Sequence, residues 1–579
     1  AGRLADPLLA IAALRRAGCA ALDAYANVEA IGHFEAALKL AERLPGFATA
    51  ELADIVHHRG QAQYRLGDWS RSRESLDRAL ALYTEAGSVP GQAQVLYSKS
   101  SLATFDSSPS DALLFLARAR DLMPDDQPLK ALALQLESQN LVDLRRYADA
   151  ARAVDEALAI ADSVDDAYVR NHARIASGYY ALATLDMPRA VDDFSRVSEA
   201  KVALQHERMA AASRRAIALA CMGELDAAAA GGAYAREYFR SMREADDVFS
   251  DPAPERDPYE FGLSCMAEGI TTIVRGRFSD AYQFLLEAME ACGDPPNVRV
   301  VQTLTPMTVQ ALYHLGRYDE ATSLLQIMGG PANGRRPAFW RLYHALELAA
   351  RGDDTGAVAD LPVPPPNHPD IRSLPVAMLA AETAVARRDA DAARLQVDAL
   401  EFLHEQGLVF TPGWVVLTSR LLGAVYILIG SELRAAPVLE AALSLARSQG
   451  ASAELALTHL ELAELHAARA DTAASRADLA EAEKLFSALG MRSCGARVRA
   501  LARRLGPAAP LADGLTEQEA DILRAVASGL TNRAIALEHA RSEHAIQRQL
   551  TAIYRKIGVE NRVAAIAYAY RNRIARDGE

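Results

Sequence analysis

Hydrogen-bonding and aromatic side chains recur at helical spacing through the N-terminal third of this chain, and they are the residues best suited to hold a ligand. Amides and hydroxyls donate and accept hydrogen bonds, and aromatic rings stack on sugar-like or peptide-like groups. The set predicted to face one groove comprises Gln61, Tyr64, Tyr97, Gln135, Gln139, His172 and Tyr179. We expect this groove to bind a small molecule, a sugar, a peptide or a protein partner. The alternative is that these side chains are polar only because water fills the groove.

Paired helices are the elements that must position this set. A turn formed by glycine, one further residue and an aromatic recurs, and residues 144–147 have the same form without the glycine. The turns with glycine are Gly67-Asp68-Trp69, Gly276-Arg277-Phe278 and Gly316-Arg317-Tyr318. A small residue follows each turn. With spacings near 40 residues, these are Ala30, Ser72, Ala112, Ala150, Ala190, Ala228, Ala281, Ala321, Ala357, Ala393, Ala435 and Ala474. The pattern resembles tetratricopeptide repeats, lengthened beyond their usual ~34 residues, in about twelve helix pairs.

Two segments interrupt this repeat. Residues 244–258 widen one spacing, and the prolines of residues 361–369 cannot continue a helix. We predict that both segments are surface insertions, because such insertions are well tolerated. The alternative is that they are hinges or loops that contact a partner.

The distribution of charge separates the C-terminal end from the rest. The chain of 579 residues carries a net charge of −13, half of its residues are hydrophobic and 6% are aromatic. Residues 491–579 hold fifteen Arg and Lys against nine Asp and Glu, so residues 1–490 carry a net charge of −19. Such an acidic body argues against nucleic-acid binding along the whole chain. Abundant alanine and few aromatic residues favour packed helices, and the predicted fold class is all-α.

Catalytic and metal chemistry find little support in the residues. No Gly-Lys dipeptide occurs, so the sequence contains no P-loop for a nucleotide. The pair His57-His58, and His459 and His466 with the nearby Glu461 and Glu464, fit no metal spacing and are interpreted as ordinary residues of helix surfaces. We therefore expect no enzymatic activity, no cofactor and no metal.

Cysteine usage and hydropathy indicate a cytoplasmic protein. The five cysteines, Cys19, Cys221, Cys265, Cys292 and Cys494, form no C-x-x-C pair and are predicted to be buried thiols in a reducing compartment. The most apolar run, residues 414–430, is interrupted by Thr418, Ser419 and Arg420. This interruption argues against a membrane span.

Residues 515–562 predict three short helices. Apolar side chains recur there at helical spacing, at Ile522, Leu523, Val526, Ile535, Ile546, Leu550, Ile553 and Ile557. Gly529 ends the first helix, Thr531-Asn532 caps the second, and Ser542 caps the third. This is a helix-turn-helix pattern, and its last helix, about residues 543–557, is predicted to enter a DNA major groove.

These residues resemble the LuxR/GerE-type DNA-binding domain of bacterial transcription regulators. The resemblance covers about a tenth of the chain. Its residues are Leu515-Thr516, Glu519, Leu523, Ala527, Gly529 to Arg533, Ile535-Ala536, Ser542-Glu543, Tyr554 to Val559 and Arg562. Large LuxR-type regulators, such as those of the maltose-regulator family, often carry a nucleotide-binding domain ahead of helical repeats. This sequence is either a piece of such a protein or a compact version of it.

The resemblance implies roles for individual residues. Base edges are expected to meet Gln547, Arg548 and Thr551, whereas phosphates are expected to meet Thr531, Asn532, Arg533, Arg555, Lys556 and Arg562. The last helix, residues 562–574, carries Val563, Ile566, Ala567 and Tyr570 on one face, which implies a homodimer or else packing within the monomer. The sequence departs from the family at His539, Arg541, Ala545, Gln547 and Gln549. These departures predict weaker phosphate binding, and a cost wherever a basic residue is buried.

We therefore predict three regions: a repeat array over residues 1–490, a basic helix and Pro/Gly/Ala linker over 491–514, and a LuxR-type domain over 515–579. The basic helix is expected either to touch DNA phosphates or to cap the array. The expected function is that of a transcription regulator that binds double-stranded DNA. The array is expected to be a sensor that binds a small molecule or protein partner and controls the C-terminal domain. The alternative is a protein-interaction scaffold whose helix-turn-helix has degenerated.

Overall fold

The computed structural model describes residues 7–24, 26–105, 108–123, 126–201, 203, 205–244, 258–291, 298–328, 338–353, 369–506, 512–539, 541–572 and 574–575. Most of both predicted insertions, linker residues 507–511, Ala357 and Cys292 therefore lie outside the described residues. The chain divides into two compact units, Ala1–Arg499 and Ala500–Glu579. We call them the array unit and the C-terminal unit.

Regular secondary structure in the described ranges is helical, apart from one isolated bridge between Phe410 and Leu417, and the predicted all-α fold is confirmed. The helices up to the middle of the array are α1 (Pro7–Asp23), α2 (Asn27–Ala41), α3 (Thr49–Arg65), α4 (Trp69–Glu85), α5 (Val89–Phe105), α6 (Pro109–Leu122), α7 (Gln127–Asp143), α8 (Tyr147–Ser163), α9 (Ala167–Ala183), α10 (Met187–Ser198), α11 (Gln205–Cys221), α12 (Leu225–Glu244), α13 (Pro258–Val274) and α14 (Phe278–Glu290). They are followed by α15 (Val298–His314), α16 (Tyr318–Met328), α17 (Ala338–Arg351), α18 (Leu374–Arg387), α19 (Ala390–Arg394), α20 (Val397–Glu405), α21 (Thr418–Leu428), α22 (Glu432–Ser448), α23 (Ser452–Ala468), α24 (Thr472–Ala488) and α25 (Gly495–Leu505). The C-terminal unit contains the short 3-10 helix η2 (Ala512–Gly514) and the helices α26 (Glu517–Ala527), α27 (Asn532–Glu538), α28 (Glu543–Lys556) and α29 (Arg562–Arg571).

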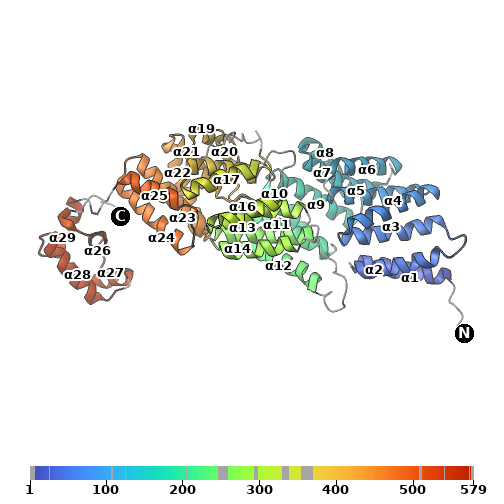
Figure 1. Cartoon of the computed structure of the whole chain (residues 1–579), viewed down its shortest axis with the longest axis horizontal. Helices are drawn as coiled ribbons and strands as arrows, with labels where there is room; N and C mark the ends of the chain where they lie inside the picture. Colours follow the sequence, from blue (N-terminus) through green and yellow to red (C-terminus); the bar gives the residue numbers. More distant parts are fainter. Residues whose placement is uncertain are drawn as a thin grey trace. The chain divides into compact units, whose positions relative to one another are not determined.

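Successive helices of the array unit pack as antiparallel pairs that stack on one another, as Figure 1 shows for α3 to α8. One register recurs. A small residue of the first helix faces a small residue twelve positions later and a large apolar residue sixteen positions later on the second helix. Examples are Gly18 with Ala30 and Phe34, Gly60 with Ser72 and Leu76, Gly178 with Ala190 and Phe194, and Gly423 with Ala435 and Leu439. A Cβ on Gly18 would lie 2.6 Å from the Phe34 ring, so the close approach requires glycine there.

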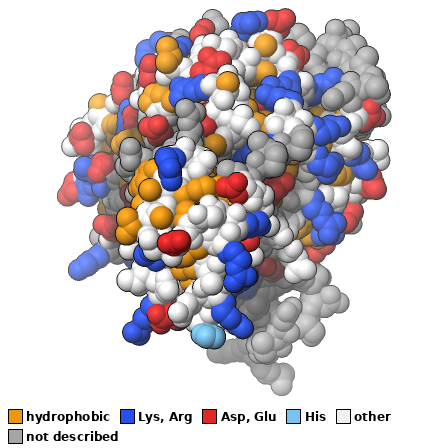
Figure 2. Space-filling model, turned by 90° about the vertical axis from the view of Figure 1, so that its left-hand side faces the viewer, with side chains coloured by type: hydrophobic (Ala, Val, Ile, Leu, Met, Phe, Trp, Pro, Cys, Tyr) orange, Lys and Arg blue, Asp and Glu red, His pale blue; other side chains and the backbone are white. Residues whose placement is uncertain are grey.

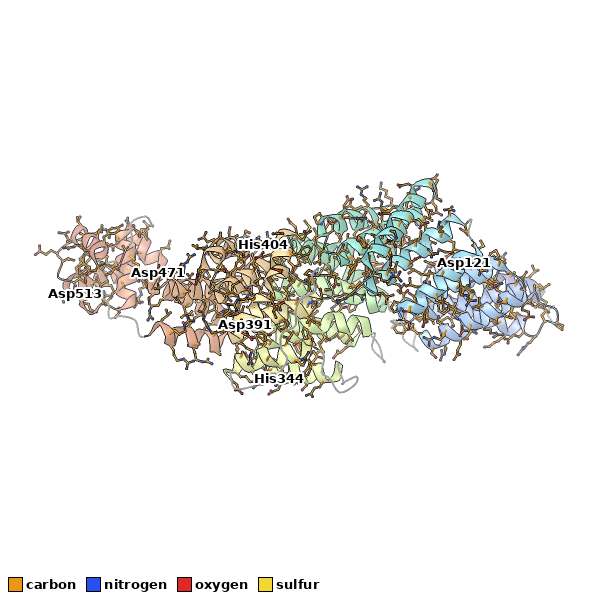
Figure 3. The ribbon with its side chains drawn as sticks, turned by 90° about the horizontal axis from the view of Figure 1, so that it is seen from above. Asp121, His344, Asp391, His404, Asp471 and Asp513 are labelled. Carbon is orange, nitrogen blue, oxygen red and sulfur yellow. The ribbon has the colours of Figure 1, made fainter. Side chains whose placement is uncertain are left out.

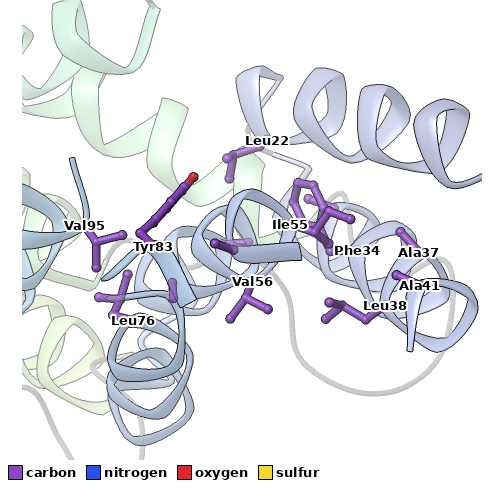
Figure 4. Packing of buried hydrophobic residues seen from close by; sticks show 14 of the residues in the cluster. Leu22, Phe34, Ala37, Leu38, Ala41, Ile55, Val56, Leu76, Tyr83 and Val95 are labelled. Atoms are coloured by element: carbon purple, nitrogen blue, oxygen red, sulfur yellow. The ribbon is translucent and has the colours of Figure 1, made fainter. Parts of the chain in front are cut away.

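The predicted small residues of the second helices are buried with no exposed surface at ten positions from Ala30 to Ala435. The last prediction, Ala474, was wrong by one residue. Ser475 is the buried residue, and its hydroxyl donates a 2.7 Å hydrogen bond to the carbonyl of Ala463, just as Ser72 donates to the carbonyl of Gly60 at 2.8 Å. Ser475 follows Ala435 by 40 residues, so the repeat keeps its spacing near 40 residues here. Figure 4 shows the first of these layers, where Phe34, Ile55 and Leu76 pack between neighbouring helices.

The turns between paired helices contain a residue with a left-handed backbone. Gly67, Gly276 and Gly316 have φ values of 78°, 77° and 73°. Arg145, in the turn predicted to be equivalent, has a φ of 58°, which confirms that it adopts the same turn without glycine. Ala470 does so as well, with a φ of 60° and an exposed side chain.

Replacing Ala470 with glycine is therefore expected to stabilise the array by about 0.5–1 kcal/mol, because a left-handed backbone costs an alanine more than it costs a glycine. The midpoint of urea unfolding at an unchanged slope measures the effect. Ala468, the exposed last residue of α23, provides the matched control. Ala468→Gly is expected to lower the midpoint, since this alanine has a helical backbone. Equal shifts in the same direction would contradict the explanation.

An irregular segment, residues 408–417, connects α20 to α21 and crosses α11 and α15. Its backbone N–H groups at Val409 and Phe410 donate to the carbonyl of Cys221 in α11, at 2.8 and 3.1 Å. The side-chain amide of Gln310 in α15 donates to and accepts from the backbone of Val415, at 2.6 and 2.7 Å. Trp414 is 1% exposed. No local sequence pattern predicts this crossing segment, which contacts α11 and α15.

The end of the array folds back against its middle. The backbone N–H of Arg492 donates to the carbonyl of His314 at 2.7 Å, and the hydroxyl of Ser493 lies 2.9 Å from the His314 ring. Arg497, in the first turn of α25, forms two hydrogen bonds of 2.9 and 2.8 Å with Glu461. The start of the predicted basic helix is therefore bound to the array, which favours the cap over the phosphate contact for this residue.

A buried ionic cluster lies beside that contact. Arg420 of α21 is 1% exposed and binds Glu382 and Glu454, the latter at 2.6 Å, and it lies 3.9 Å from Glu461. The arginine that interrupts the apolar run is thus the centre of a charge network in the protein interior. None of the described helices combines the length and hydropathy needed to cross a bilayer.

Candidate nucleic-acid interface

The helices of the C-terminal unit begin at side chains that accept hydrogen bonds from free backbone N–H groups. Thr516 and Glu519 form a reciprocal capping box, with distances of 3.3 and 2.7 Å. Thr531 accepts from Ala534 at 3.2 Å, and Ser542 accepts from Ala545 at 3.2 Å. The predicted caps of α27 and α28 are confirmed, and Gly529, with a φ of 83°, ends α26 as predicted.

The core of this unit is separate from that of the array. The eight apolar residues predicted from Ile522 to Ile557 are all buried. Helix α29 adds Ala565, Tyr568 and Ala569 to the same core. Four short helices thus hold one another rigidly enough to present a defined surface.

Helix α28 presents a polar stripe. Gln547, Arg548 and Thr551 are exposed, while Ile546, Leu550 and Ile553 occupy the opposite, buried face. His544 and Arg555 extend the exposed stripe by one turn in each direction. The predicted base-edge residues therefore share one accessible face of one helix.

The predicted phosphate anchors differ in their surroundings. Arg533 and Arg555 are exposed. Lys556 binds Glu519 at 2.6 Å, and this hydrogen bond lowers the pKa of that carboxyl. Arg562 is half-buried, and it donates to the carbonyl of Leu530 and to the Asn532 side chain, the latter at 3.3 Å. Lys556, Asn532 and Arg562 therefore also tie the helices of this unit together.

This difference predicts two separable effects. Arg562→Gln is expected to lower the melting temperature of the C-terminal unit, because the carbonyl of Leu530 loses a charged donor. Arg533→Gln is expected to leave the melting temperature unchanged and to reduce the salt dependence of DNA binding by about one charge. Thermal unfolding and salt titrations of both variants measure the two effects. A loss of stability in Arg533→Gln with none in Arg562→Gln would contradict the assignment.

Arg541 is one of the residues at which this sequence departs from the LuxR/GerE-type pattern, and the loss of stability expected from burying it does not arise. Its side chain is exposed, and His539 is only half-buried. On α29, the face predicted for pairing remains accessible in part, with Val563 75% and Tyr570 38% exposed. Hydrophobic side chains are also seen together, with charged side chains of both signs around them, on the side of the molecule drawn in Figure 2.

The groove residues predicted in the array unit do not gather at one site. Gln61 lies 3.2 Å from the Ser98 hydroxyl, and Gln135 and Gln139 are buried. Tyr64 packs with the first core cluster, Tyr97 with a small separate one, and His172 lies 3.3 Å from Glu207. Tyr179 donates to Asp143 at 3.3 Å and lines a cavity of about 430 Å³. This cavity was not foreseen, because residues far apart in the sequence form it.

Metal-binding geometry does not occur among the described residues, where no three His, Cys, Asp or Glu side chains cluster for an ion. Figure 3 shows Asp121 and His404 on separate helices of the array unit.

The interpretation of His57 and His459 as surface residues was wrong, because both are buried. His57 contacts Ser98 at 2.9 Å, and burial lowers its pKa to about 3, so it is neutral. His459 contacts Asp478 at 2.8 Å.

The predicted burial of the cysteines is confirmed for Cys221, Cys265 and Cys494, whereas Cys19 is half-buried. Burial raises the pKa of the Cys221 thiol to about 12 and that of Cys494 to about 11. These thiols are therefore protonated at neutral pH, and thiolate chemistry is not available to them.

Comparisons with known proteins concern mainly the C-terminal unit. Residues 513–569 match the family described as bacterial regulatory proteins, luxR family. The transcriptional regulatory protein YdfI of Bacillus subtilis (strain 168) is 42% identical over 55 residues, which cover 10% of this chain and 26% of YdfI. The chain thus spans about a quarter of the length of that curated relative.

Two solved structures are similar to this chain at low identity. A tetratricopeptide repeat protein from Parabacteroides merdae is 15% identical, with a TM-score of 0.33 over 52% of this chain and 99% of that one. The APC/C hetero-tetramer Cut9–Hcn1 is 15% identical, with a TM-score of 0.38 over 96% of both chains. The repeat architecture rests on the register described above.

Proposed function

We propose, from the premise that residues 513–569 form a DNA-binding domain of the LuxR family, that this chain is a transcription regulator that binds double-stranded DNA through α28. The single observation that carries the proposal is the exposed stripe Gln547, Arg548 and Thr551 on a capped helix whose opposite face is buried. A helix in this setting fits the major groove.

Each side chain of the stripe has a proposed role. The planar guanidinium of Arg548 suits the O6 and N7 acceptors of guanine, and the amide of Gln547 suits the N6 and N7 pair of adenine. Thr551 donates to the carbonyl of Gln547 at 3.0 Å, which leaves its methyl group for contact with thymine. Arg533 and Arg555 would bind phosphates beside the groove.

The array is proposed to act as a sensor that controls this binding. Helix α25 is fixed at its start through Arg497 and Glu461, and only a short connection separates it from the domain. A ligand or partner that changes the array would then act on the domain through this connection. The exposed side chains of α29 would pair two copies on a repeated DNA site.

Controlled cleavage of the connection tests this regulation. A protease site placed within residues 507–511 cuts the chain between α25 and η2, so DNA affinity can be measured in one sample before and after cleavage. If the array restrains the domain, cleavage raises the affinity for DNA at fixed salt. Equal affinities before and after cleavage would contradict the sensor role but leave DNA binding itself in place. A chain with no salt-dependent DNA affinity in either state would instead favour the scaffold alternative.

A further inference from the structure

The cavity beside Tyr179 lies where the first helices of consecutive helix pairs meet two further segments, which are residues 371–375 and the crossing segment 408–417. Residues of α7, α9, α11, α13 and α15 line it, together with segment 371–375 and residues 412–413 of the crossing segment. The backbone N–H of Ile371 donates to the carbonyl of Ala183 at 3.1 Å, which holds one crossing segment against α9. Its volume of about 430 Å³ lies within the range of small-molecule sites.

The charges on the lining are already paired. Arg214 forms two hydrogen bonds with Glu260, at 2.7 and 2.6 Å, and both side chains are nearly buried. Arg372 binds Asp143, whose side chain is 3% exposed and also accepts from Tyr179. A charged ligand group would enter without a free counter-ion, and burying it would be costly.

The remaining walls are mostly apolar. Leu182, Ile217, Leu263 and Ile371 supply aliphatic surface. Hydrogen-bonding capacity is confined to a few groups, chiefly Asp143 with its partners Arg372 and Tyr179. A carboxylate can accept from a hydroxyl, and a guanidinium can donate to a carbonyl, while their own pairing keeps the site neutral.

We infer that this cavity is the ligand site of the array, and that its ligand is a neutral, largely apolar small molecule bearing hydroxyl or carbonyl groups. The inference rests on the proposed sensor function and specifies its site and ligand class. A ligand held there contacts the repeats and both crossing segments at once. A bound ligand therefore stabilises one arrangement of the crossing segment 408–417, which is hydrogen-bonded to Gln310 of α15.

A neutral fluorescent probe tests the location in the full chain. N-phenyl-1-naphthylamine is expected to bind saturably at one site. Leu263→Trp and Ile217→Trp fill the cavity and are expected to abolish this binding, whereas Leu433→Trp, at a position 88% exposed, leaves it unchanged. Thermal unfolding confirms that each variant is folded. Saturable binding retained by both folded cavity variants would overturn the site.

Competition tests the ligand class. Octanol is expected to displace the probe about tenfold better than octanoate or octylamine, which carry a charge on the same chain. Asp143→Asn leaves the cavity volume nearly unchanged and removes one negative charge from its lining, so this variant should bind octanoate more tightly than the unaltered chain does. If octanoate or octylamine displaces the probe from the unaltered chain as well as octanol does, the ligand is not restricted to neutral molecules and the inference is overturned. The DNA affinity of Leu263→Trp, measured without probe, distinguishes a wrong ligand site from a wrong function. If the variant still binds DNA, failure of the probe experiment concerns the ligand site and not the proposed regulator.

Discussion

Replacing Arg548 with alanine is expected to weaken binding of the full chain to its preferred duplex by about 10- to 100-fold, and to relax its preference at one base pair. The reason is that a guanidinium donating two hydrogen bonds to guanine contributes about 1–3 kcal/mol of discrimination. Arg548 is exposed on α28, so the substitution should not disturb the fold. Competition with duplexes altered at single positions measures both effects.

Arg555 supplies the matched control, because it is exposed on the same helix but is proposed to meet phosphate. Arg555→Ala is expected to lower the affinity for every duplex alike and to reduce the salt slope by about one charge. If Arg548→Ala lowers all affinities alike and leaves the preference intact, Arg548 does not read bases.

Replacing Arg420 with methionine is expected to destabilise the array by about 3–5 kcal/mol, because the buried carboxylates lose their central counter-ion. Burial alone would raise the pKa of Glu382, yet Arg420 and Arg497 hold it below its ordinary value. In the native chain this carboxylate therefore contributes stability above its unfolded pKa, and the contribution is lost as the pH falls through the folded pKa.

Without Arg420, burial dominates and the pKa of Glu382 is expected to rise. The folded state then takes up a proton more readily than the unfolded state, so the loss of stability should be larger at pH 8 than at pH 5. Melting temperatures at both pH values measure this difference. Arg434→Met, which removes a 56% exposed side chain paired with Glu401, should cost no more than about 1 kcal/mol. A loss in Arg420→Met that is small or independent of pH would contradict the ionic role.

Local signals were sufficient to predict the C-terminal unit. Thr531 and Ser542 cap helices through hydrogen bonds that span three residues, and the apolar side chains recur within one short window. The turn at Arg145 was also predictable, because its neighbours repeat the pattern of the glycine-containing turns. Such features depend on nearby residues, which a sequence displays directly.

Features that depend on distant residues were missed. Gln310 and Val415 are 105 residues apart, and no local pattern indicates that an irregular segment crosses α15 there. Arg420 was interpreted only as an interruption of an apolar run, because its glutamate partners lie on other helices. The groove residues likewise share a sequence pattern without sharing a cavity, because only Tyr179 of that set lines the cavity of about 430 Å³.

The most direct test of DNA reading by α28 is selection by the full chain from a library of random-sequence duplexes, at an ionic strength near 0.15 M. The proposal predicts enrichment of one motif that contains a guanine whose preference depends on Arg548. It also predicts two copies of that motif at fixed spacing if α29 pairs two chains. Recovery of duplexes with no sequence in common beyond the starting library would contradict the central claim.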